Sequence, residues 1–282
     1  MNKITALFKL LRFELPFSAG VCVVMGQLLA LGRFASVSEM LLGFSSVFLI
    51  SASILVLNDY FDIETDKINA PHRPLPSNTV AQAEALSLAV TLMFGGLFLS
   101  FLLGIVTLLS AVALLIIGFL YNRLFKQSGL PGNLMVSLSV GMTFIYGAMA
   151  VGQPLNKRAW FFGVIAALID LGEEIAADAM DMQGDQLIAS NSLAIKYGKA
   201  AALRISSLIF YFVILLTGFP FILGWFRTIY IAPITVMDVS IAYGTFKLLK
   251  CHNESGRKYI RWIYLGATLG LLIFIFMRLI GI

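Results

Sequence analysis

The stretch NDYFDIETD, residues 58–66, decides the architecture, because it follows directly on 40–57, a run without a single charged residue. Charge beside such a run is costly and is usually functional. Asn58, Asp62 and Asp66 recur every four residues, so on a helix they form one polar stripe. A carboxylate stripe without a cation repels itself. We therefore expect something positive to be bound there.

A second acidic stretch lies far downstream, at residues 170–185. The acids that share one helical face in it are Glu174, Asp178, Asp181 and Asp185. An ordinary acidic helix beside the membrane is the alternative, but the stretch contains no Lys or Arg to pair with its acids. Most of the 15 Asp and Glu residues of the chain fall in the two stretches. We expect the rest of the chain to be a scaffold that brings them face to face.

The composition indicates a membrane protein. Of the 282 residues, 59% are hydrophobic and only 12% are charged, and the mean hydropathy is +0.91. A soluble domain is about a quarter charged. The net charge of +5 does not indicate nucleic acid as a partner, because the basic residues stand at the ends of apolar segments. Cys22 and Cys251 show neither metal-site nor disulfide spacing.

The fold class predicted is an all-α, polytopic bundle of about nine transmembrane helices, forming one domain over 1–282. The expected segments are 15–33, 40–57, 83–103, 105–121, 133–151, 159–177, 203–224, 229–248 and 260–280. Because almost nothing joins 83–103 to 105–121, a tight hairpin around Gly104 is expected.

The distribution of Lys and Arg predicts the orientation, since cytoplasmic loops carry an excess of both. With the N-terminus in the cytoplasm, most of the 20 Lys and Arg residues fall on that side. Both acidic stretches then lie on the cytoplasmic face of the cell membrane. A site at the cytoplasmic mouth of the bundle is therefore expected.

Cations near these stretches are candidates for binding an anion. Arg73 lies in a loop stiffened by three prolines within 71–76, in which His72 is expected to be a surface residue. Arg123 and Lys126 are expected on one helical face at a cytoplasmic boundary. The other candidate cations are Arg12, which stands before the first apolar run, and Lys196. Position alone favours a topology anchor for Arg12, and two cations at a boundary such as Arg123 and Lys126 are usually topology signals.

These features together predict a substrate that is both strongly negative and apolar. Carboxylates at helical spacing suit Mg²⁺, which binds one or two of them plus phosphate oxygens. An apolar bundle suits a hydrocarbon chain and keeps water from a reactive carbocation. A polyprenyl diphosphate has both properties, with diphosphate as a leaving group. The rival functions are a cation-coupled transporter, whose intramembrane acids mark an ion pathway, and a non-catalytic lipid-binding protein.

The chain resembles the UbiA superfamily of intramembrane prenyltransferases over about residues 10–200. The motifs that carry the resemblance are the N-D-x-x-D-x-x-x-D pattern at Asn58, Asp59, Asp62 and Asp66, the second acidic pattern at Asp178, Asp181 and Asp185, the tyrosine–lysine pair Tyr121 and Lys126, the R-P-L-P-S loop 73–77, and Arg12. The resemblance implies nine helices and Mg²⁺-dependent transfer of a polyprenyl group to a lipophilic acceptor within membrane lipid.

The resemblance implies roles for particular residues. The expected Mg²⁺ ligands are Asp62, Asp66, Asp178, Asp181 and Asp185. The expected diphosphate contacts are Asn58, Arg12, Arg73, Arg123, Lys126 and Lys196. Tyr121 is expected to stabilise the allylic cation through its ring. Glu173 and Ala177 stand where the glycerol-lipid branch of the family often has basic residues, so both an aromatic acceptor and geranylgeranylglyceryl phosphate stay open.

Overall fold

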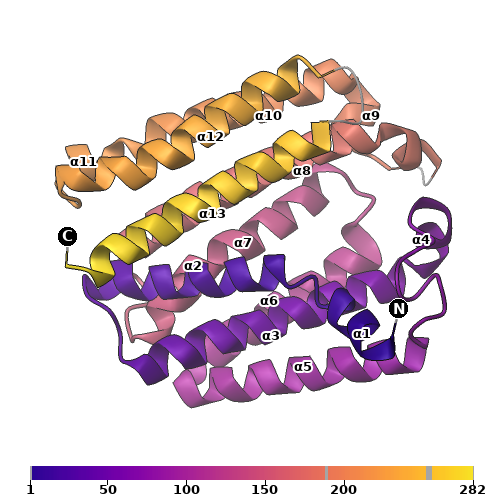
Figure 1. The fold of residues 1–282 in the computed structure, drawn as a ribbon, viewed down its shortest axis with the longest axis horizontal. Helices are drawn as coiled ribbons and strands as arrows, with labels where there is room; N and C mark the ends of the chain where they lie inside the picture. Colours follow the sequence, from indigo (N-terminus) through magenta and orange to yellow (C-terminus); the bar gives the residue numbers. More distant parts are fainter. Residues whose placement is uncertain (1, 188–189, 252–255, 282) are drawn as a thin grey trace. The chain divides into compact units, whose positions relative to one another are not determined.

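The apolar segments of the sequence form α-helices in the structure, a computed structural model that describes residues 2–187, 190–251 and 256–281, without the side chains of 69 and 183–187. Figure 1 shows the helices in chain order. They are α1 Lys3–Leu10, α2 Glu14–Leu31, α3 Val37–Phe61, α4 Ile63–Asn69, α5 Gln82–Leu103, α6 Ile105–Leu120, η1 Tyr121–Phe125, α7 Leu130–Ala150, α8 Lys157–Leu187, α9 Leu193–Tyr197, α10 Lys199–Thr217, α11 Phe219–Ile222, η2 Thr228–Tyr230, α12 Ile231–Leu249 and α13 Arg257–Leu279. No strand occurs in the described ranges, which confirms the all-α prediction.

Eight helical segments of the described chain are long and apolar enough to cross a membrane. They correspond to eight of the nine expected segments. The ninth, 159–177, lies within α8, which has 31 residues and carries Asp170, Glu173 and Glu174 near its middle. These acids lower its hydropathy. At about 1.5 Å per residue, α8 is nevertheless longer than the hydrocarbon core of about 30 Å.

The chain divides into two compact units. The N-terminal unit comprises Met1–Leu124 and Met142–Trp160, and the C-terminal unit comprises Phe125–Gly141 and Phe161–Ile282. The first acidic stretch therefore belongs to the N-terminal unit and the second to the C-terminal unit. Each unit is described by itself below.

Helix α3 is the centre of the N-terminal unit, where it packs against α2 on one side and α5 on the other (Figure 1). Small residues allow close helix contacts, as is usual in membranes. A Cβ atom at Gly26 of α2 would lie 2.1 Å from the carbonyl oxygen of Phe144, so only glycine lets α7 approach here. The hydroxyl of Ser53 donates to the carbonyl oxygen of Ala89 at 2.8 Å and ties α3 to α5.

A single glycine makes the turn between α5 and α6, as expected. Gly104 has φ 129° and ψ 170°, a conformation that side chains other than hydrogen do not favour. Thr107 secures the turn because its hydroxyl donates to the carbonyl oxygen of Ser100 at 2.8 Å. The two helices can therefore run antiparallel with almost no connecting loop.

Helix α12 packs against both α13 and α10 in the C-terminal unit. A Cβ atom at Gly266 of α13 would lie 2.1 Å from Cβ of Ser240 on α12, which again shows a contact that requires glycine. Asp238 of α12 accepts a hydrogen bond at 3.0 Å from the hydroxyl of Thr217 on α10. This hydrogen bond of an acid within an expected membrane segment joins two helices of the unit.

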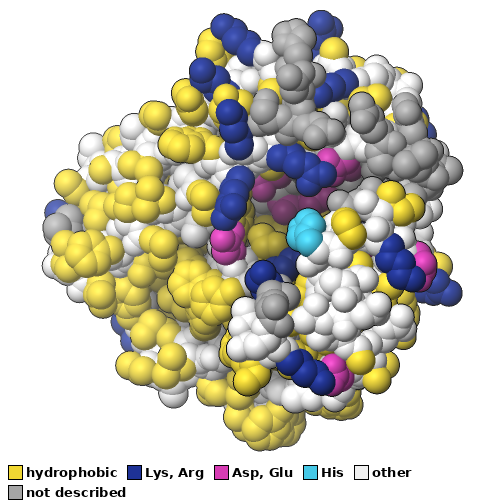
Figure 2. Space-filling model, turned by 45° about the vertical axis from the view of Figure 1, so that its right-hand side comes forward, with side chains coloured by type: hydrophobic (Ala, Val, Ile, Leu, Met, Phe, Trp, Pro, Cys, Tyr) yellow, Lys and Arg dark blue, Asp and Glu magenta, His cyan; other side chains and the backbone are white. Residues whose placement is uncertain are grey.

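The surface of the described chain is rich in exposed apolar side chains. Figure 2 shows hydrophobic side chains covering wide areas of one face. On α5 and α6 the exposed ones include Phe94, Phe98, Ile105 and Leu109. Exposed apolar area on this scale marks contact with another apolar phase, which for helices of this length is the lipid.

Candidate active site

The first acidic stretch spans the junction between α3 and α4. Asp62 ends α3 with φ −90° and ψ 2°, and α4 begins at the next residue. The helical hydrogen bonds nevertheless continue through it: the amide of Asp62 donates to the carbonyl oxygen of Asn58 at 3.0 Å, and that of Asp66 donates to Asp62 at 2.7 Å. The three polar residues therefore keep the helical spacing that the sequence predicts.

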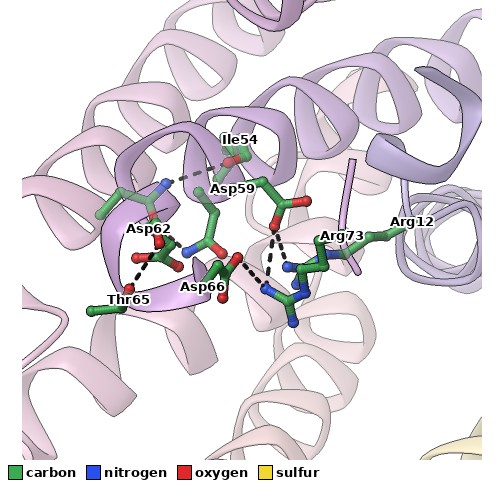
Figure 3. Close-up of polar contacts among 9 residues, drawn as sticks. Arg12, Ile54, Asp59, Asp62, Thr65, Asp66 and Arg73 are labelled. Atoms are coloured by element: carbon green, nitrogen blue, oxygen red, sulfur yellow. Dashed lines mark hydrogen bonds and ion pairs between the residues drawn. The ribbon is translucent and has the colours of Figure 1, made fainter. Parts of the chain in front are cut away.

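Arginines from two other segments neutralise this stretch (Figure 3). Arg12 pairs with Oδ1 of Asp59, and Nη1 of Arg73 lies 2.7 Å from Oδ2 of Asp66 and 3.7 Å from Oδ1 of Asp59. The side chains of Asp59 and Asp66 are only 5% and 10% exposed, so these ion pairs are shielded from water. The tertiary fold therefore supplies positive charge to Asp66 of the stripe and to Asp59 beside it, and a metal ion bound at the stripe stays a prediction.

The proline loop holds Arg73 in place through its backbone and its core contacts. The amide of Arg73 donates to the carbonyl oxygen of Ala70 at 2.9 Å, and Arg73 accepts from the amide of Ser77 at 3.0 Å. Leu75 and Val80, on either side of Ser77, are buried in the hydrophobic core of the N-terminal unit. The exposed position of His72 agrees with its expected place on the surface.

Asn58 contacts a residue that sequence reasoning missed. Its Nδ2 donates to Oδ1 of Asn122 at 2.8 Å, and Nδ2 of Asn122 donates to the carbonyl oxygen of Ile54 at 3.3 Å. Asn122 is buried within η1, a π-helical turn that directly continues α6. Turns of this kind are rare and are frequent at functional sites.

The π-helical turn also changes the placement of the predicted cations. Tyr121 is half-buried at its start, and Arg123 is exposed within it. The helix ends at Phe125, so Arg123 and Lys126 do not share a regular helical face, and that prediction is wrong. The local widening from α to π geometry has no clear signature in side-chain spacing.

The second acidic stretch lies on α8, where each of three acids has a partner from another element of the C-terminal unit. Nδ2 of Asn133 on α7 donates to Oδ2 of Asp178 at 2.9 Å, and the hydroxyl of Ser137 donates to Oδ2 of Asp170 at 3.0 Å. Asp181 pairs with Arg257 at the start of α13. Sequence reasoning missed Asn133, Ser137 and Arg257. Asn133 and Arg257 stand at or near the edge of an apolar run and Ser137 lies within one, and a single polar residue in such a place is a weak signal.

The remaining predicted site residues of this unit are Lys126, Lys196 and Asp185. Lys126 lies within electrostatic range of Glu174. Lys196 is exposed in the last turn of α9. The side chain of Asp185 lies outside the described residues. That the two acidic stretches face each other stays a prediction.

The donor set fits Mg²⁺ in the mode that depends on substrate phosphate. Among the described residues, no group of three or more Asp, Glu, His or Cys side chains is arranged to hold a metal ion. Mg²⁺ usually uses one or two protein carboxylates and completes its shell with water and phosphate oxygens. Taken by itself, each unit offers half-buried carboxyl groups of this kind, Asp62 in the N-terminal unit and Asp178 and Asp181 in the C-terminal unit.

Comparison with known proteins shows the family of this chain. The family model described as "UbiA prenyltransferase family" matches residues 19–266. Digeranylgeranylglyceryl phosphate synthase of Methanocaldococcus jannaschii is 31% identical over 277 residues, which cover 98% of this chain and 96% of that protein.

Solved structures share the fold along the whole length. One from work on digeranylgeranylglyceryl phosphate synthase in membranes has a TM-score of 0.75 at 30% identity and covers 99% of both chains. A UbiA homologue from Archaeoglobus fulgidus bound to GPP and Mg²⁺ has a TM-score of 0.69 at 17% identity, with 95% of this chain and 99% of that one covered. The protein therefore belongs to the UbiA prenyltransferase family and is a multi-pass membrane protein.

Proposed function

We propose that this protein transfers a geranylgeranyl group from geranylgeranyl diphosphate to the free glycerol hydroxyl of geranylgeranylglyceryl phosphate, with release of diphosphate. The observation that carries the proposal is the 31% identity to a digeranylgeranylglyceryl phosphate synthase over 98% of this chain. It favours the glycerol lipid over the aromatic acceptor that the sequence left open. Family membership also decides against the cation-coupled transporter.

The first acidic stretch binds the charged end of the donor in this proposal. Asp62 and Asp66 would hold Mg²⁺, which, when bound, neutralises diphosphate charge as the allylic C–O bond breaks. The guanidinium groups of Arg12 and Arg73 both lie at the first acidic stretch. Asn58 has an amide that can donate to a phosphate oxygen. The chain thus supplies both the metal ligands and the cations that stabilise a leaving diphosphate.

The second acidic stretch and its surroundings have corresponding roles. Asp178, Asp181 and Asp185 are proposed Mg²⁺ ligands, with Asn133 fixing the carboxylate of Asp178. Arg123, Lys126 and Lys196 are proposed diphosphate contacts. The ring of Tyr121 is proposed to stabilise the allylic cation. Apolar helices exclude water, so the glycerol hydroxyl meets no competing nucleophile.

The proposal includes the topology and the extent of the domain. The N-terminus lies in the cytoplasm, because this orientation places most Lys and Arg residues on the cytoplasmic side. Residues 1–282 act as one prenyltransferase domain in the cell membrane, in agreement with a family match that covers residues 19–266.

A transfer assay on the purified protein tests the proposal. Geranylgeranyl diphosphate is supplied with Mg²⁺ or with EDTA, and geranylgeranylglyceryl phosphate and 4-hydroxybenzoate are offered side by side. We expect the glycerol lipid to be prenylated, with the activity lost in EDTA. Prenylation of 4-hydroxybenzoate instead would move the protein to the aromatic branch. Absence of diphosphate release with every acceptor would contradict the proposal.

A further inference from the structure

Asp59 stands apart from the polar stripe of the first acidic stretch. It is one residue on from Asn58, so its side chain leaves α3 about 100° around the helix axis from that of Asn58. It is the more buried of the two acids that pair with arginine here, with a side chain only 5% exposed. A buried carboxylate requires compensating charge, and the structure supplies two guanidinium groups for it.

Arg12, the partner of Asp59, has an unusual backbone conformation. It lies between α1 and α2 with φ 45°, in the left-handed region that residues other than glycine rarely adopt. Such a conformation is unfavourable and persists only where the surroundings determine it. Asp59 lies 47 positions away along the chain, and its ion pair with Arg12 is an interaction that stabilises this backbone conformation.

Arg73 approaches the same oxygen atom of Asp59 as Arg12 does. Its Nη1 lies 3.7 Å from Oδ1 of Asp59, the atom that also accepts from Arg12. Figure 3 shows both guanidinium groups converging on this carboxylate. Two like charges this close repel each other unless an anion lies between them. Asp59 is the shared anion, whereas the one ion pair of Asp66 within the described residues is with Arg73.

We propose that Asp59 is a positioning residue that holds Arg12 and Arg73 together so that both guanidinium groups meet one diphosphate. It acts through the two arginines and is not a ligand of metal or substrate. Long arginine side chains lose rotamer entropy on binding, and a fixed pair has already lost it before the ligand arrives. The inference rests on the proposed function, in which Arg12 and Arg73 contact diphosphate.

Calorimetric binding of inorganic diphosphate to the purified protein with Mg²⁺ tests the inference. We expect Asp59→Asn to weaken binding about tenfold, which corresponds to the loss of one charge-assisted interaction. The Mg²⁺ concentration that gives half-maximal binding should not change. Glu64→Gln is the matched control, because Glu64 is an exposed acid of the same stretch that pairs only with Lys67 in the described structure.

A double-mutant cycle separates positioning from direct contact. In the background Arg12→Gln with Arg73→Gln, the substitution Asp59→Asn should cause no further loss, because its partners are gone. A loss that multiplies with theirs would show that Asp59 contacts the ligand or metal itself, and would overturn the inference. Unchanged diphosphate affinity in Asp59→Asn, with only a lower melting temperature, would also overturn it.

A second variant covers the case in which Asp59→Asn does not fold. Asp59→Glu keeps the charge and moves the carboxylate by one methylene group, so positioning predicts weaker diphosphate binding that disappears in the double-arginine background. Failure of the proposed function is recognised separately, because wild-type protein would then bind no diphosphate with Mg²⁺ present.

Discussion

Asn133 and Asp178 are joined across α7 and α8 by a hydrogen bond of 2.9 Å, donated by a buried amide to a carboxylate. Asp178 is a proposed Mg²⁺ ligand, and its orientation therefore depends on a residue outside both acidic stretches. Residues that hydrogen-bond a metal ligand orient that ligand, and their replacement commonly lowers metal affinity or activity about 10–100-fold.

Replacement of Asn133 tests this dependence. We expect Asn133→Ala to lower kcat/KM about tenfold, since a hydrogen bond to a charged group contributes about 1.5–3 kcal/mol. Steady-state transfer kinetics over a range of Mg²⁺ concentrations measure the effect. Ser139→Ala is the control on the same helix, because within the described residues that hydroxyl donates to the carbonyl oxygen of Met135 in its own helix. Equal kinetics for the two variants would contradict an orienting role.

Asp62 is expected to be required for transfer but not for folding. It is half-buried at the junction of α3 and α4, and its backbone, rather than its side chain, carries the helical hydrogen bonds. Asp62→Ala should abolish prenyl transfer and leave the melting temperature unchanged, as measured by product formation and thermal unfolding in detergent. Glu64→Ala should keep full activity, because exposed ion pairs contribute about 0–1 kcal/mol. Full activity of Asp62→Ala would remove it from the metal site.

Gly147 is expected to be critical for stability. A Cβ atom there would lie 2.1 Å from the carbonyl oxygen of Val23 on α2, and the backbone oxygen cannot rotate away. Gly147→Ala should therefore destabilise the protein by about 3 kcal/mol, the upper part of the range for overpacking. Gly218→Ala is the control, since its nearest atom would be 3.6 Å away. Thermal unfolding of both variants gives the comparison, and similar melting temperatures would contradict the close approach of the backbones.

Tyr146 links three helices of the N-terminal unit. Its hydroxyl lies 2.9 Å from that of Ser46 on α3 and donates to that of Ser100 on α5 at 2.8 Å. Tyr146→Phe should lower the free energy of unfolding by about 1–2 kcal/mol while transfer activity remains, because both serines keep a bond to their own helices. Tyr211→Phe, at a partly exposed tyrosine, should have no effect on unfolding. A larger change at Tyr211 than at Tyr146 would contradict this.

The helices could be predicted well from the sequence, because the length of an apolar run and the position of a glycine at a turn are local properties. The expected segment 83–103 became α5 Gln82–Leu103, and the turn fell at Gly104. The spacing of Asn58, Asp62 and Asp66 also survived, since it depends only on consecutive helical hydrogen bonds.

The partners of the acids could not be predicted in the same way. Asp59 pairs with Arg12, which is 47 positions distant, and Asp178 pairs with Asn133, which is 45 positions distant. Which residue pairs with each acid depends on how the helices pack, and many basic or amide side chains of the chain could equally bind the same carboxylate. For this reason the position of Arg12 in the sequence, taken alone, favoured a topology anchor over a site residue.

The junction at Asp62 places the proposed chemistry immediately beyond the uncharged run 40–57 of α3. This run is about 27 Å long at about 1.5 Å per residue, slightly shorter than a typical hydrocarbon core of about 30 Å. A thicker bilayer would draw Asn58 and the buried Asp59 towards the acyl chains, at a cost for each ångström of mismatch. The turnover of the enzyme should consequently depend on the acyl-chain length of the host lipid and fall as the bilayer thickens.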